Sequence, residues 1–157
     1  MKITNVSVIK YDEARYQRDV VLGLQANGFV VQPHDEKCVK NVPDFSFAGS
    51  GVDGWVELKW LNTQPKTLRH IRHFTDGQRQ WLIDTGKAGS GNCYLWVGGL
   101  NMPHVIISHQ HLLSKYVGIP FTSMIDEYSF VVDRDLQSAT KEFVKKLIKY
   151  IDTNLKA

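Results

Sequence analysis

Residues 43–60 read PDFSFAGSGVDGWVELKW and decide the fold. Strand-forming residues flank a glycine-rich reversal, which predicts a β-hairpin with arms at Phe45–Ala48 and Trp55–Trp60 and a loop at Gly49–Gly54. Successive side chains of a strand point to opposite faces. The second arm therefore presents polar side chains on one face and apolar side chains on the other.

The hairpin predicts a polar patch. A loop of this length pairs Ala48 with Trp55. Counting back along both arms places Asp44 opposite Lys59, with Glu57 diagonal to it. Two carboxylates beside an ammonium group would hold a hard divalent cation next to a proton donor or acceptor. A slip of one residue in the strand register would turn Asp44 to the other face. The alternative interpretation is an exposed hairpin whose charged side chains serve only solubility.

Two motifs, Val42-Pro43-Asp44-Phe45 and Val56-Glu57-Leu58-Lys59, resemble those of the PD-(D/E)xK nuclease superfamily. The resemblance covers roughly residues 12–98. It implies an α/β, restriction-endonuclease-like core in the order helix, three-strand meander, helix, strand. It also implies magnesium-dependent hydrolysis of phosphodiester bonds in DNA.

The composition is that of an ordinary globular domain. The chain has 157 residues, a net charge of +3 and 43% hydrophobic residues, which fits a single domain at 1–157. No apolar run approaches the roughly 18 residues of a membrane span, and the first residues lack the apolar core of a signal peptide. Cys38 and Cys93 form no disulfide or metal motif, so we expect reduced cysteines and a cytoplasmic location.

The periodicity and breakers predict the remaining elements. They are a helix at Asp12–Asn27 stopped by Gly28, a strand at Phe29–Gln32, a polar connection at Leu61–Phe74, a helix at Thr75–Lys87, strands at Cys93–Val97, His104–Ser108 and Tyr128–Val132, and a helix at Leu136–Leu155. The part beyond residue 100 lies outside the resemblance. We expect it to add strands to the sheet and to cover it with the terminal helix.

The resemblance implies roles for the motif residues. Asp44 and Glu57 would be ligands of Mg²⁺, with Mn²⁺ as a substitute and the Leu58 carbonyl as a third ligand. Magnesium keeps several waters, so two carboxylates suffice. Lys59 would orient or deprotonate the attacking water, or neutralise charge on the phosphate.

Two helical positions have alternative interpretations. The first helix of many relatives carries an acidic ligand, for which Glu13 is a candidate, but the spacing of junction resolvases puts Gln17 there. Glu13 would also suit the first turn of a helix without any metal. Gln78 matches a glutamine that is frequent in the second helix of related nucleases and would be catalytic, whereas a capping box with Thr75 explains it without any catalysis.

A basic cluster follows the motif strand. It comprises Lys66, Arg69, Arg72 and Arg79. Phosphate contacts would be needed there, so we predict DNA binding, with a solvated basic loop as the alternative. His70 with His73 and His109 with His111 lack a third partner at a readable spacing, which favours incidental histidines over metal ligands.

The resemblance therefore implies a metal-dependent DNA endonuclease. Within the superfamily, a small single domain of this size resembles junction resolvases and the phage and repair nucleases that cut branched DNA. A homodimer is expected if the substrate is a four-way junction, with the apolar stripe of the last helix as a candidate interface. The stripe comprises Phe143, Val144, Leu147, Ile148 and Ile151. The alternative is a catalytically silent DNA-binding or assembly protein that retains the nuclease fold.

Overall fold

The computed structural model describes residues 11–34, 40–89, 92–99, 102–114, 116, 118–121, 129–132 and 136–155. Its elements are α1 (Glu13–Ala26), β1 (Val30–Pro33), β2 (Phe45–Gly49), β3 (Val52–Leu61), a 3₁₀ turn η1 (Leu68–His70), α2 (Asp76–Ala88), β4 (Cys93–Gly99), β5 (Met102–Ser108), α3 (His109–Ser114), β6 (Ser129–Val132) and α4 (Leu136–Leu155). Of the residues named in the predictions, Cys38 and Tyr128 lie outside the described chain, as do the side chains of Ile148 and Ile151.

The described strands form one sheet in the order β1-β2-β3-β4-β5-β6. β3 and β4 run parallel, because α2 carries the chain back between them, and the other neighbours are antiparallel. The predicted order of helix, three-strand meander, helix and strand is confirmed. So are the additional strands and the terminal helix that follow it.

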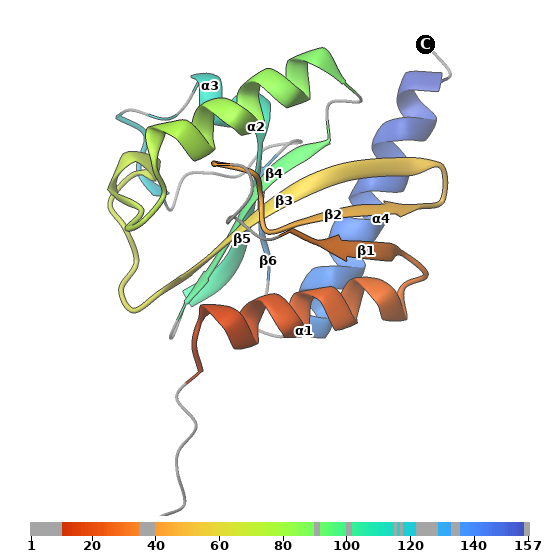
Figure 1. Ribbon diagram of the computed structural model, residues 1–157, viewed down its shortest axis with the longest axis horizontal. Coiled ribbons are helices and arrows are strands. Elements are labelled where there is room, and N and C mark those ends of the chain that lie inside the picture. Colours follow the sequence, from red (N-terminus) through yellow and green to blue (C-terminus); the bar gives the residue numbers. More distant parts are fainter. Residues whose placement is uncertain are drawn as a thin grey trace, which may run out of the picture.

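The sheet separates two apolar cores. On one face, α1 and α4 pack around Tyr16, Trp96 and Phe143, which are fully buried. The predicted dimer interface on the last helix is therefore wrong for its described side chains, because Phe143, Val144 and Leu147 are buried in this core. On the other face, α2 and α3 cover Leu82 and Leu95. Figure 1 shows the two layers, with α1 and α4 on one side of the sheet and α2 and α3 on the other. A polar side chain that leaves the sheet toward α2 is therefore enclosed between apolar residues.

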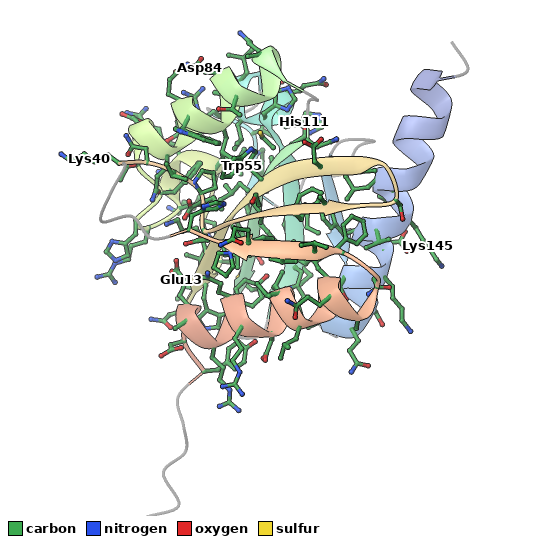
Figure 2. The ribbon with its side chains drawn as sticks, turned by 45° about the vertical axis from the view of Figure 1, so that its right-hand side comes forward. Glu13, Lys40, Trp55, Asp84, His111 and Lys145 are labelled. Carbon is green, nitrogen blue, oxygen red and sulfur yellow. The ribbon has the colours of Figure 1, made fainter. Side chains whose placement is uncertain are left out.

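The helix ends follow their capping residues. Asp12 accepts a hydrogen bond from the Arg15 N–H at 2.9 Å and so starts α1 at Glu13. The helix ends before Gly28, whose φ of 88° favours glycine. Figure 2 shows Glu13 at one side of the molecule, while Lys145 of α4 lies at the other.

The predicted loop of the hairpin is wrong. Gly49 pairs with Val52, so Ser50 and Gly51 alone form the turn, with φ values of 53° and 79°. Two successive residues with positive φ are typical of a tight type I′ hairpin turn. Gly54 lies within β3, where a Cβ would collide with the Asn92 backbone oxygen. Close packing, and not a turn, therefore accounts for that glycine.

The corrected register keeps the predicted faces. Phe45 pairs with Val56, which moves the partner of each β2 residue by two positions along β3. Because strand side chains alternate with a period of two, Asp44, Glu57 and Lys59 still share one face. An unpredicted short helix, α3, follows β5 directly. None of the described helices combines the length and the apolar character that a membrane crossing requires.

Candidate metal centre

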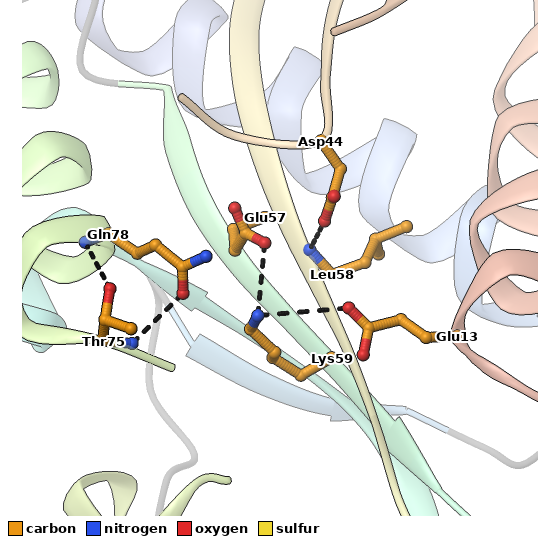
Figure 3. A network of polar contacts seen from close by, with 7 residues as sticks. All are labelled: Glu13, Asp44, Glu57, Leu58, Lys59, Thr75 and Gln78. Atoms are coloured by element: carbon orange, nitrogen blue, oxygen red, sulfur yellow. Dashed lines mark hydrogen bonds and ion pairs between the residues drawn. The ribbon is translucent and has the colours of Figure 1, made fainter. Parts of the chain in front are cut away.

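Three carboxyl groups from separate parts of the chain meet at one edge of β3. Asp44 immediately precedes β2, Glu57 lies within β3, and Glu13 is the first residue of α1. One carboxylate oxygen of each lies within 4.8 Å of the other two. Figure 3 shows Lys59 between Glu57 and Glu13, with Asp44 above them. Like charges this close favour either protonation or a bound cation.

The backbone of Leu58 orients Asp44. The Leu58 N–H donates a hydrogen bond to Asp44 Oδ2 at 2.7 Å. The strand register brings Asp44 level with Glu57, because the next residue, Phe45, pairs with Val56. The predicted position of Asp44 opposite Lys59 is therefore wrong. This hydrogen bond fixes one carboxylate oxygen close to β3. The Leu58 carbonyl as a metal ligand stays a prediction.

Glu57 is the most buried carboxyl group of the three, with 1% of its surface exposed. Its Oε1 lies 3.4 Å from Lys59 Nζ, while its buried Oε2 has no hydrogen-bond partner among the described residues. Burial, and then the nearby charge of Asp44, raises the pKa of Glu57 to about 9. A buried polar atom without a partner is unfavourable. A divalent cation would supply that partner, so the residues present fit a metal.

Lys59 balances part of the negative charge. Its Nζ lies 3.4 Å from Glu57 Oε1 and 4.0 Å from Glu13 Oε1, and its side chain is only 5% exposed. Burial raises the pKa of Glu13, and the Lys59 ammonium opposes that rise. The buried ammonium therefore holds two carboxyl groups near one another without itself being a metal ligand.

Of the two candidates in the first helix, the structure brings Glu13 to the acidic group. The cap at Asp12 starts α1 beside β3, so its first residue reaches Lys59. Gln17 lies four residues after Glu13, about one turn further along the helix. The first-turn position of Glu13 also suits the helix dipole. Its function as a ligand therefore stays a prediction.

Gln78 forms the capping box of α2 with Thr75. The side-chain Oε1 of Gln78 accepts a hydrogen bond from the Thr75 backbone N–H at 3.1 Å. The backbone N–H of Gln78 donates a hydrogen bond to Thr75 Oγ1 at 3.1 Å. The side chain is 9% exposed, and its carboxamide is turned toward Glu57 and Lys59 (Figure 3). The capping interpretation thus accounts for the carboxamide oxygen. A catalytic function of Gln78 would depend on the nitrogen.

The ligand types favour a hard divalent cation. Within the residues that the structure describes, the group of three or more metal-ligating side chains contains carboxylates only. Oxygen ligands of this kind suit hard cations such as Mg²⁺, whereas zinc is more often held by nitrogen and sulfur. The histidine pairs lie elsewhere: His70 and His73 on the connection to α2, His109 and His111 on α3.

Three of the four basic residues predicted to contact DNA are exposed. Lys66, Arg69 and Arg72 lie on the connection between β3 and α2. Arg79 is bound within the protein, because its Nε donates a hydrogen bond to the Leu112 carbonyl at 2.9 Å. Its guanidinium also lies 4.0 Å from the centroid of the Tyr116 ring. Arg79 therefore joins α2 to the segment around α3.

A pocket at the end of β3 was not anticipated from the sequence. Trp60, which follows Lys59 directly, lines it together with the chain that leads toward His73. The Asn62–Pro65 stretch signalled only a loop, since a pocket depends on contacts between residues distant in the chain. The breaker residues after a motif strand were the one sequence signal that pointed to this place.

The comparisons with known proteins support the fold. No protein-family model matches the sequence, and the comparison with curated proteins gives no match. Among solved structures, the chain is similar to Hjc, a Holliday junction resolvase from the archaeal hyperthermophile Archaeoglobus fulgidus. The TM-score is 0.50 at 14% sequence identity, over 79% of this chain and 90% of Hjc. The restriction-endonuclease-like fold implied by the PD-(D/E)xK resemblance is thus confirmed.

Proposed function

We propose that this protein is a metal-dependent DNA endonuclease. The observation that carries the proposal is the buried Oε2 of Glu57, which has no hydrogen-bond partner among the described residues and lies in a group with Asp44 and Glu13. Solvated surface acids would not need to bury such an atom. Burial of this kind is expected where the group serves to hold a cation.

The residues of the centre would have separate roles in the reaction. Asp44, Glu57 and Glu13 would hold Mg²⁺ or Mn²⁺, with the Leu58 carbonyl as a further ligand. The metal would supply polarisation of the scissile phosphate and of the attacking water. Lys59 would orient or deprotonate that water, or stabilise the charge that develops on the phosphate. Gln78 would help to position the reacting groups through its amide nitrogen.

The exposed residues Lys66, Arg69 and Arg72 would contact the phosphate backbone. Replacing any one with alanine is expected to weaken DNA binding equally for different sequences, since phosphates carry no sequence information. The slope of log affinity against log salt concentration should fall by roughly 0.9 for each lost phosphate contact. Fluorescence anisotropy over a range of salt concentrations measures this slope.

Lys145→Ala is the matched control, because Lys145 is exposed on α4 at the other side of the molecule from Glu13 (Figure 2). It removes the same charge and should leave the slope unchanged. Parental affinity and slope in all three variants of the basic connection would show that this connection is a solvated loop. Arg79→Ala is unsuitable as a test, since Arg79 is held by Leu112 and Tyr116.

Branched DNA is the proposed substrate class. The comparison that supports it is the shared fold with a Holliday junction resolvase. Symmetric cleavage of a four-way junction requires two active sites, so such an activity would call for a homodimer. An intracellular enzyme of DNA repair or recombination, or one encoded by a phage, would suit this activity.

The experiment that tests the proposal is incubation with duplex, single-stranded, flap and four-way-junction DNA, with and without Mg²⁺. We expect metal-dependent cleavage that is faster on the branched substrates. Cleavage of none of them would overturn the proposal. Tight DNA binding without cleavage would instead favour a silent DNA-binding or assembly protein that retains the fold.

A further inference from the structure

A pocket of about 200 Å³ opens beside the proposed metal centre at the carboxyl end of β3. It is smaller than the roughly 300–1,000 Å³ of sites for drug-sized ligands, so its occupant is a small group or one unit of a polymer. Its polar and aromatic walls come from Trp60, Asn62, Thr63, His70, Arg72 and His73.

Trp60 lines this pocket, and its ring is held in place by aromatic contacts. Its ring makes an edge contact with Tyr11 at 4.6 Å between centroids and a tilted contact with Tyr16 at 5.1 Å. Tyr11 is itself held, because its hydroxyl donates a hydrogen bond to Asp19 at 2.8 Å. The indole remains partly exposed. A fixed and partly exposed indole is a surface on which a planar group can stack.

Basic side chains also line the pocket. Arg72, His70 and His73 line it and are all exposed. Thr67 Oγ1 lies 2.7 Å from His70 Nδ1, which orients that imidazole. These side chains would attract an anionic group such as a phosphate.

His73 has a backbone conformation that side chains rarely adopt, with a φ of 64°. Such strain persists where the surrounding structure requires the residue in that place. The pocket adjoins the acidic group through β3, because the lining residue Trp60 directly follows Lys59, whose Nζ lies 4.0 Å from Glu13 Oε1. The pocket and the proposed metal centre are therefore neighbours.

We propose that this pocket binds one unpaired nucleotide of branched DNA next to the scissile phosphate, with its base on Trp60 and its phosphate at Arg72. The inference rests on the proposed nuclease function and specifies its substrate. A base inside a continuous duplex is stacked on both faces and cannot present one to the indole. The pocket would thus favour a flap or fork, where a nucleotide beside the branch is free to enter.

Binding of a flap oligonucleotide with 2-aminopurine at the unpaired position beside the branch tests this inference. The measurement is made in Ca²⁺, so that binding is read without cleavage. Trp60→Leu is expected to weaken flap binding by roughly 5- to 150-fold, the loss of one base-aromatic stack. Affinity for a continuous duplex should stay within about twofold, because the phosphate contacts remain. Parent protein should quench the 2-aminopurine fluorescence, and Trp60→Leu should not.

Two further variants separate stacking from stability. Trp60→Phe keeps an aromatic face and should retain most of the affinity and the quenching. Trp81→Leu is the matched control, because Trp81 is a partly buried tryptophan that packs on Trp55, away from the pocket. It should leave flap binding unchanged.

Parental flap affinity in Trp60→Leu, or an equal loss on flap and duplex, would overturn the inference. So would an absence of quenching by the parent protein, which requires no substitution at all. These outcomes are distinct from failure of the proposed function, which is read in Mg²⁺ as an absence of cleavage by the parent.

Discussion

Glu57→Gln is expected to reduce DNA cleavage by at least ~100-fold, the loss that follows removal of one charge-stabilising group. The same substitution is expected to stabilise the metal-free protein at pH 7. The two effects have one origin, since Glu57 is 1% exposed and its Oε2 has no hydrogen-bond partner among the described residues. Glutamine keeps the shape and removes the carboxylate that would hold the metal.

The sign of the stability effect follows from the pKa. Burial, and then Asp44, raises the pKa of Glu57 from 4.5 to about 9 in the folded protein. Below the unfolded pKa, Glu57 is protonated in both states, so its ionisation does not change the free energy of unfolding. Between pH 4.5 and about pH 9, Glu57 is ionised in the unfolded chain but stays protonated in the folded protein. The free energy of unfolding therefore falls as the pH rises through this range. At pH 7 the loss amounts to at most about 3 kcal/mol, and glutamine avoids it.

Denaturant unfolding in the presence of a chelator, at pH 4 and pH 7, measures this effect. The stabilisation by Glu57→Gln should be present at pH 7 and absent at pH 4. Glu142→Gln is the matched control, because Glu142 is exposed on α4 and should change neither stability nor cleavage. An equal stability difference at both pH values would contradict the electrostatic explanation. Parental cleavage by Glu57→Gln would remove Glu57 from the site.

Removal of the metal is expected to have an effect on cleavage as large as that of Glu57→Gln. A chelator should abolish cleavage, and Mg²⁺ or Mn²⁺ should restore it. Ca²⁺ should bind with little turnover, because its larger and looser coordination shell positions the attacking water poorly. The binding should depend on Asp44, whose carboxylate the Leu58 N–H fixes at 2.7 Å.

Calorimetric titration of Mn²⁺ into the parent protein and into Asp44→Asn tests that dependence. Asparagine can still accept the hydrogen bond from Leu58, so the fold should survive while metal affinity falls. Glu142→Gln again serves as the control, with parental affinity expected. Divalent binding that is the same with and without the Asp44 carboxylate would contradict the metal centre.

The sequence predicted the order of the elements because their ends have strong local signals. Asp12 and Gly28 bound α1, and Thr75 caps α2 through its side chain. Alternation along β3 predicted that Glu57 and Lys59 share a face. These properties depend on neighbours in the chain, so a single sequence contains them.

The register and the pocket depended on distant contacts. The sequence predicts a loop around Gly54, whereas the structure places Gly54 within β3, where close approach to Asn92 requires a glycine. The sequence predicts that Arg79 contacts DNA but gives no sign of the hydrogen bond that Arg79 donates to the Leu112 carbonyl across the fold. The Trp60 ring is held by an edge contact with Tyr11, which precedes α1 and is distant from Trp60 in the sequence. Spacing within one chain could not reveal these contacts.

The most direct test of the central claim is cleavage of a labelled four-way junction by the parent protein and by Lys59→Ala, purified in parallel, with and without Mg²⁺. The Lys59 side chain is 5% exposed and lies between Glu57 and Glu13. A contaminating nuclease would cleave equally in both preparations, because the substitution changes only this protein. We expect cleavage by the parent only with Mg²⁺, and a rate at least ~100-fold lower for Lys59→Ala. Equal rates for the two proteins, or cleavage by the parent that persists without a divalent metal, would contradict the claim.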